Sequence, residues 1–178
     1  GYHWKELNNG KPWVNPAIGM RRMRDPFITK DPRKGFHMVW TIGNQKMGYA
    51  HSNDLVHWSA PQTIPVFADN PNVKNVWAPE MSYDNDTKNW FIYWSSTIKG
   101  DFPETDGQVK NEKNHRIYYM TTDDFKSFSK PKLFYNPGFP VIDATLFKEN
   151  DTYYMVVKDE RDIPLKKNLR ITSSKNIL

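Results

Sequence analysis

The sequence predicts an all-β protein of the β-propeller type, because a strand-rich unit recurs along the chain and helical periodicity is missing. Short runs of aromatic and β-branched residues alternate with turn-forming segments. No long stretch spaces its apolar residues as an amphipathic helix does. A repeated, mostly antiparallel unit of about 40–50 residues is typical of a propeller blade. A β-sandwich is the alternative architecture.

The clearest repeat is a polar turn that ends in an aromatic residue and a proline. Residues 52–61 (SNDLVHWSAP) resemble residues 122–131 (TDDFKSFSKP). A partial copy begins with Gly1-Tyr2-His3-Trp4, and a truncated copy covers residues 172–178. Because residue 1 falls inside a motif, we expect the chain to begin within a longer gene product. The lack of a visible signal peptide then carries little information.

Strand-like runs come in sets of three before these turns. The first runs are residues 25–28, 78–82 and 143–147, the second are 36–41, 90–95 and 153–157, and the third are 46–50, 117–120 and 169–172. Asp-, Asn- and Gly-rich segments that suit hairpins separate the first and second runs. We therefore expect part of a single domain, with blades at residues 15–66, 67–137 and 138–178. Residues 98–115 are expected to form a long, polar, mobile loop.

Composition excludes several classes of function. The 25 basic residues are interleaved with 20 acidic ones, which is not the pattern of a nucleic-acid-binding stripe despite the net charge of +5. No apolar run approaches the length of a membrane span. Cysteine is absent, so disulfides and thiolate chemistry are excluded. The five histidines show no metal-ligand spacing, so no metal site is predicted.

Three motifs, each opening one repeated unit, resemble those of glycoside hydrolase family 43. They are Met23-Arg24-Asp25-Pro26, residues 76–81 (VWAPEM) and residues 141–147 (VIDATLF). The resemblance covers nearly the whole chain. It implies a five-bladed β-propeller, of which this chain would hold about three blades. It also implies a hydrolase that cleaves arabinose-, xylose- or galactose-containing glycans, and so an oligosaccharide or polysaccharide as partner.

The resemblance also implies roles for four residues. By matching motifs, Asp25 resembles the general base of the family, and Asp143 resembles the aspartate that orients the general acid and tunes its pKa. Trp77 and Glu80 are expected to contact substrate. Each has a simpler alternative: an Asp-Pro turn for Asp25, a bulge or strand start for Asp143, blade packing for Trp77, and a partner of a buried arginine for Glu80.

The expected chemistry is hydrolysis with inversion, which uses two carboxyl groups roughly 6.5–9.5 Å apart. An ionised base needs hydrogen bonds or a nearby cation; Arg21, Arg22 and Arg161 are candidates, whereas strand alternation points Arg24 away from Asp25. The general acid of the family is a glutamate on the fourth blade, expected beyond residue 178, and the activity of the fragment alone is left open. Glu160 is the only stand-in within this chain.

The leading hypothesis is a secreted or periplasmic glycosidase that degrades plant-type polysaccharides. It would remove arabinofuranosyl, xylosyl or galactosyl units, with an α-L-arabinofuranosidase as first choice and a β-xylosidase next. No cofactor is required, and calcium is the one ion that the resemblance allows, because some family members hold it on the central axis. The alternatives are a non-catalytic carbohydrate-binding propeller and a related propeller enzyme acting on fructosides.

Overall fold

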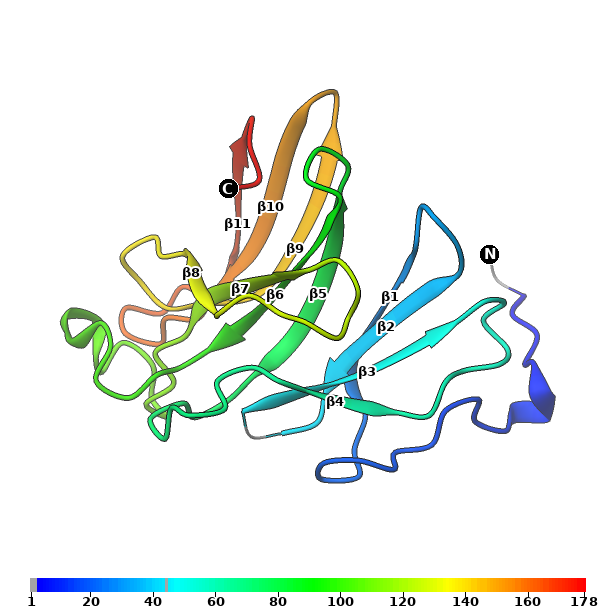
Figure 1. The fold of residues 1–178 in the computed structure, drawn as a ribbon. Coiled ribbons are helices and arrows are strands. Elements are labelled where there is room, and N and C mark those ends of the chain that lie inside the picture. The colour runs from blue at the N-terminus through cyan, green and yellow to red at the C-terminus, as the bar shows by residue number, and fades with distance from the viewer. Residues whose placement is uncertain (1–2, 44) are drawn as a thin grey trace.

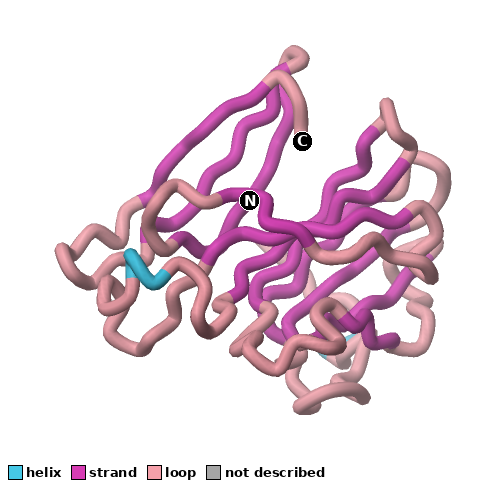
Figure 2. The backbone as a smooth tube through the Cα atoms, turned by 60° about the vertical axis from the view of Figure 1, so that its left-hand side comes forward, coloured by secondary structure: helices cyan, strands magenta, loops and turns pink. Residues whose placement is uncertain are grey.

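The computed structural model describes residues 3–43 and 45–178, and it consists of three antiparallel sheets (Figures 1 and 2). Blade 1 contains β1 (Arg24–Lys30), β2 (Phe36–Thr41), β3 (Lys46–Ser52) and β4 (Gln62–Pro65). Blade 2 contains β5 (Trp77–Asp84), β6 (Asn89–Ser96), β7 (Arg116–Thr122) and β8 (Lys132–Tyr135). Blade 3 contains β9 (Val141–Glu149), β10 (Thr152–Asp159) and β11 (Leu169–Ser174). The short 3-10 helices η1 (Asn8–Gly10) and η2 (Pro103–Thr105) complete the elements.

The predicted repeat of strand, turn and strand is confirmed in all three sheets, and the turn after the third strand is also present. Sequence analysis missed the fourth strands β4 and β8. Each has only four residues and a largely exposed pattern, so neither shows a clear alternation. The partial turn motif that begins at residue 1 falls partly on residues 1–2, which lie outside the described residues.

The sheets follow one another as propeller blades. In each blade the strands run in chain order from the innermost strand outward, and β1, β5 and β9 are the innermost strands. The β5 strand packs against β1 and β2, while β9 packs against β5, β6 and β7. Figure 1 shows the sheets fanning out from these inner strands. The expectation of an all-β propeller with about three blades is therefore confirmed.

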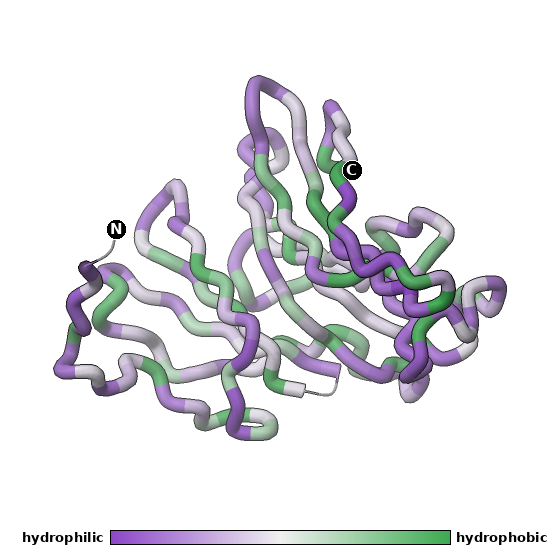
Figure 3. The backbone as a smooth tube through the Cα atoms, turned by 180° about the vertical axis from the view of Figure 1, so that it is seen from behind, coloured by the Kyte–Doolittle hydropathy of each residue, from purple (hydrophilic) through white to green (hydrophobic). Residues whose placement is uncertain are grey.

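Apolar and aromatic side chains hold neighbouring blades together. Between blades 1 and 2 the buried core includes Val39, Met47, Met81, Trp90 and Ile92. Between blades 2 and 3 it includes Phe91, Tyr93, Ile117, Val141 and Met155. Figure 3 shows hydrophobic segments along the strands and hydrophilic ones concentrated at the turns. Burial between sheets explains the aromatic-rich composition, since large rings bury much apolar area per residue.

The predicted polar loop at residues 98–115 is present, but it is folded against blade 2. Arg116 has no exposed surface and donates hydrogen bonds to Asn114 Oδ1 (2.9 Å) and Thr105 Oγ1 (2.9 Å). It also donates to Asn136 Oδ1 (2.6 Å) in the loop after β8. A buried guanidinium needs such partners, and these bonds tie the loop to the sheet. The loop is therefore anchored at its C-terminal end, not free in solvent.

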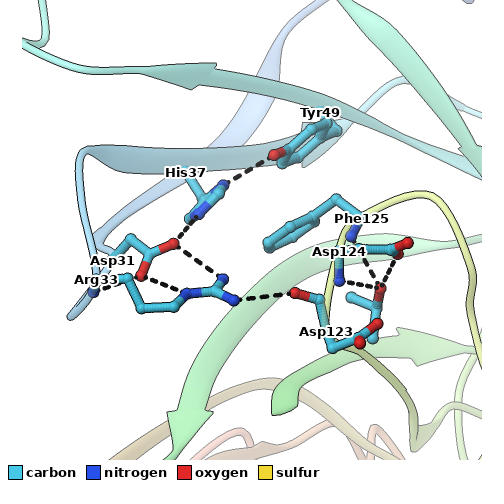
Figure 4. Close-up of polar contacts among 8 residues, drawn as sticks. Asp31, Arg33, His37, Tyr49, Asp123, Asp124 and Phe125 are labelled. Carbon is cyan, nitrogen blue, oxygen red and sulfur yellow. Dashed lines mark hydrogen bonds and ion pairs between the residues drawn. The ribbon is translucent and has the colours of Figure 1, made fainter. Parts of the chain in front are cut away.

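A polar chain joins blades 1 and 2 at the end of the strands that carries the β1–β2 turn (Figure 4). Arg33 donates to both carboxylate oxygens of Asp31 and, through Nη1, to the backbone oxygen of Asp123 (3.2 Å). His37 Nε2 lies 2.8 Å from Asp31 Oδ2, and His37 Nδ1 lies 2.8 Å from Tyr49 Oη. Most of these groups are buried, so this network fixes the two blades without taking part in the site described next.

Candidate active site

Each innermost strand carries a β-bulge near its start. The register with the second strand shifts there, and a residue adopts a left-handed backbone: Asp25 (φ 50°), Ala78 (φ 46°) and Asp143 (φ 54°). Aspartate tolerates this conformation better than most residues that are not glycine. A bulge bends the strand and re-aims a side chain. The same device therefore recurs at the same end of three adjacent inner strands, and two of the three positions hold a carboxylate.

Asp25 is exposed, and its carboxylate is held by a hydroxyl group. Thr41 Oγ1, at the end of β2, donates a hydrogen bond to Asp25 Oδ2 (2.8 Å). Arg161, one of the cations considered as a partner of Asp25, forms an ion pair with Asp159 instead (2.6 Å). The guanidinium of Arg24 lies 5.6 Å from the centroid of the Trp77 ring. The carboxylate is thus oriented by a hydroxyl donor on the neighbouring strand.

Asp143 is exposed, and its backbone is held by the neighbouring blade. Its backbone N–H donates to Ser95 Oγ (3.1 Å) in blade 2. Partial burial raises the pKa of Asp143, and the negative charges of Asp25 and Glu160 act in the same direction, whereas the Lys158 ammonium lowers it. Asp25 is thus near enough to Asp143 to influence its protonation. The two carboxylates, far apart in the sequence, share one side of the molecule.

Trp77 is half-buried at the first position of β5, surrounded by cationic and aromatic groups. The Lys113 ammonium lies 4.1 Å from the centroid of the Trp77 ring, and the His115 ring lies 5.4 Å away. The Lys113 contact suits cation–π attraction, and the His115 contact is a tilted ring pair. A sugar stacking on the face that Lys113 covers would have to displace this flexible side chain. The structure therefore puts Trp77 at the same strand end as Asp25 and Asp143.

Glu80 faces the junction of blades 2 and 3. Tyr93 Oη donates a hydrogen bond to Glu80 Oε2 (2.8 Å). Tyr93 Oη also accepts a hydrogen bond from the N–H of Leu146 (3.0 Å) on β9. Burial raises the pKa of Glu80, hydrogen bonds from Tyr93 and Thr145 lower it, and the charge of Asp143 raises it, with a net rise. The simpler alternative named a buried arginine as partner. In the structure the partner is a buried tyrosine.

Glu160 does not have the properties of a general acid. Its side chain is 13% exposed and lies between the Lys158 ammonium (2.5 Å) and the Lys167 ammonium (2.6 Å). Burial raises its pKa, but the two lysines outweigh this effect, and the pKa of Glu160 falls below its usual value. A general acid must hold a proton near neutral pH. The expectation that Glu160 could stand in for the acid is therefore wrong on electrostatic grounds.

Sequence reasoning missed the side chains that end the second strands. Thr41, Ser95 and Lys158 are register equivalents, because each pairs with the residue that precedes the bulge of its own blade. Thr41 and Ser95 bind the bulge of the following blade through their hydroxyl oxygens. The predicted runs 36–41 and 90–95 already end at Thr41 and Ser95. Extending the third run, 153–157, by one residue would have added Lys158 at the equivalent position.

His115 is buried beside Trp77. It is 2% exposed, and neither ring nitrogen has a hydrogen-bond partner among the described residues. Burial lowers the pKa of His115 to about 4, so the ring is neutral at pH 7. His37 belongs to the Asp31 network at the other end of β2.

Metal ligation finds no support in the part of the chain that the structure describes. Within residues 3–43 and 45–178, no group of three or more His, Cys, Asp or Glu side chains is arranged to hold an ion. Nor is any helix in those ranges long and apolar enough to cross a membrane.

Comparison with known families accounts for this geometry. The profile of a family related to glycoside hydrolase family 43, described as "Probable glycosyl hydrolase domain", matches residues 1–177. The chain belongs to this glycosyl hydrolase family. As a member it is similar to an α-L-arabinofuranosidase of Bifidobacterium longum subsp. longum, with 25% identity over 90% of the chain and 17% of that protein. It is also 28% identical to a probable arabinan endo-1,5-α-L-arabinosidase A of Aspergillus fumigatus, over 80% of the chain and 44% of that protein.

Solved structures place this glycosyl hydrolase chain in the same fold. An endo-arabinase from Bacteroides thetaiotaomicron superposes with a TM-score of 0.69 at 16% identity, covering 92% of the chain and 54% of the enzyme. The α-L-arabinofuranosidase from Lactobacillus brevis gives a TM-score of 0.65 at 21% identity, over 91% of the chain and 50% of the enzyme. The chain therefore spans about half, or less, of the length of the proteins it matches.

Proposed function

We propose that the complete protein containing this chain is a glycosidase that hydrolyses its substrate with inversion. The observation that carries the proposal is the pair of carboxylates, Asp25 and Asp143, at equivalent bulges of the first and third blades. Their charges interact across the end of β5. Family membership supports the reaction class, and it favours a catalytic role over a carbohydrate-binding module without activity.

In the proposed reaction Asp25 acts as general base. Its ionised carboxylate takes a proton from a water molecule, whose oxygen attacks the anomeric carbon from the face opposite the leaving group. The bond from the anomeric carbon to the leaving oxygen breaks, and that oxygen receives a proton from a carboxylic acid. Asp143 would raise the pKa of that acid, because two nearby negative charges disfavour ionisation. Trp77 would support the apolar face of a sugar ring.

The proposed substrates are arabinofuranosyl linkages in plant-type polysaccharides. One curated relative is named α-L-arabinofuranosidase, and another is named probable arabinan endo-1,5-α-L-arabinosidase A. We favour removal of single α-L-arabinofuranosyl units, with xylosyl and galactosyl linkages next. Because such polymers are too large to enter a cell, we further propose a secreted or periplasmic location, which fractionation of the producing cells would test. The chemistry requires no cofactor, and added calcium is expected to leave turnover unchanged.

The test is the variant Asp25→Asn in the complete protein. Loss of a general base lowers turnover by about 10²- to 10⁴-fold, so kcat on an aryl α-L-arabinofuranoside should fall by that factor while thermal unfolding stays the same. Asp151→Asn is the matched control, because Asp151 is exposed in the β9–β10 turn at the far end of β9. Near-normal turnover by Asp25→Asn would refute the role of Asp25.

A further inference from the structure

We propose that Thr41 is the positioning residue for Asp25, a role that rests on the proposed function. Thr41 ends β2 and is 1% exposed. Its hydroxyl oxygen contacts two groups: it donates to Asp25 Oδ2 (2.8 Å) and accepts the backbone N–H of Ala78 (3.0 Å). Asp25 is on blade 1 and Ala78 on blade 2, so one buried atom joins the proposed base to the neighbouring blade.

The direction of these bonds follows from the chemistry of a hydroxyl group. A threonine hydroxyl has one proton and two acceptor sites. The Ala78 N–H can only donate, so it occupies a lone pair, and the single proton is left for the carboxylate. The backbone of blade 2 therefore fixes the hydroxyl, and the hydroxyl fixes the carboxylate. Because Thr41 is buried, water has little access to compete for either bond.

Comparison between blades separates the two parts of this role. Ser95 is the register equivalent of Thr41 in blade 2, and it accepts the N–H of Asp143 in blade 3. The bulge residue of its own blade, however, is Ala78, which has no carboxylate. The backbone link between blades thus recurs without a base, whereas donation to a carboxylate occurs where the proposed base stands. Thr41 has a task beyond joining blades.

The experiment compares Thr41→Val with Thr41→Ser in the complete protein. Valine keeps the branched shape but removes the hydroxyl, whereas serine keeps the hydroxyl. A small displacement of a reacting group can cost about 10²-fold in rate. We expect Thr41→Val to lower kcat by about 10- to 100-fold, with KM within about twofold of wild type. Thr41→Ser should restore kcat to within about threefold of the wild-type value.

A stability control distinguishes positioning from general loosening of the blade junction. Tyr49→Phe removes a buried hydroxyl from the same blade, the one that contacts His37, and leaves Asp25 untouched. It should lower the unfolding temperature without a fall in kcat. If Thr41→Val does not fold, Thr41→Ala removes the same hydroxyl with less steric conflict, and a tenfold or greater fall in kcat is again expected.

The outcomes separate this inference from the proposed function. Wild-type turnover by Thr41→Val or Thr41→Ala, with Asp25→Asn inactive, would overturn the role of Thr41 alone. An equal fall in kcat for Thr41→Ser and Thr41→Val would overturn it too, because the hydroxyl would then not matter. If the wild-type protein releases no sugar from arabinose-, xylose- or galactose-containing substrates, the proposed function itself fails.

Discussion

The hydroxyl group of Tyr93 offers a direct test of how blades 2 and 3 are joined. Tyr93 is 1% exposed, donates to Glu80 within its own blade and accepts the N–H of Leu146 from the next. The variant Tyr93→Phe keeps the ring and removes only this hydroxyl. It leaves a half-buried carboxylate and a backbone N–H without their partner, and burial limits replacement by water.

The expected loss is the sum of two hydrogen bonds. A bond to a charged group contributes about 1.5–3 kcal/mol and a neutral one about 0.5–1.5 kcal/mol, so Tyr93→Phe should lower the free energy of unfolding by about 2–4.5 kcal/mol. The loss should also depend on pH. The Tyr93 bond lowers the pKa of Glu80 by stabilising its ionised form. Removing it therefore costs more at a pH above the raised pKa of Glu80, where the carboxylate is ionised, than at a pH below it.

Urea unfolding followed by tryptophan fluorescence would measure both effects in the complete protein. Tyr119→Phe is the control, since Tyr119 is partly buried and packs against the same core. A loss below about 0.5 kcal/mol, within the range of an ordinary surface substitution, would refute the reasoning.

The same assay on Glu80→Gln bears on the role of Glu80: a change in stability with constant KM indicates a structural role, and a change in KM indicates substrate contact.

Two further outcomes are expected. A Cβ atom on Gly48 would overlap the indole ring of buried Trp40, so Gly48→Ala should lower the free energy of unfolding by about 1–3 kcal/mol in the same urea assay, and a neutral effect would contradict the packing. Stability should also fall on acidification. Burial lowers the pKa of His37, and hydrogen bonds from Arg33 and His37 hold the pKa of Asp31 well below its usual value despite burial. Folded-state pKa values below the unfolded ones mean that stability is lost as pH falls, first below about 6.5 through His37 and then below about 3.8 through Asp31. Urea unfolding between pH 7 and pH 3 would show this decline, which His37→Gln should reduce above pH 4.

The fold was predictable because local and global signals agree. Aromatic and β-branched runs, separated by turns rich in Asp and Asn, are visible in the sequence and become β1, β2, β5, β6, β9 and β10. The outer strands β4 and β8 were not predictable, because an edge strand of four residues needs little apolar alternation. Their place is set by pairing with β3 and β7, which only the folded sheet provides.

The site was predictable only in part. Asp25 and Asp143 carry motif signals, but the charges around them come from residues that are close only in the folded chain. The lysines that keep Glu160 ionised are two and seven residues away in sequence, yet sequence gives no sign that both ammonium groups converge on one carboxylate. Thr41 was likewise invisible, since a threonine at the end of a β-strand is ordinary, and its two partners lie 16 and 37 residues away.

The bulges bear on both the structural and the proposed catalytic interpretation of Asp25 and Asp143. A left-handed residue at a bulge is a structural feature, and Ala78 shows that the fold forms it without a carboxylate. Regular alternation would turn successive side chains to opposite faces, whereas the bulge breaks this rule at the same place in each blade. The structural role of these positions is thus compatible with the catalytic role that we propose for the aspartates. The bulge sets the direction, and the side chain that stands there decides whether a blade contributes a carboxylate.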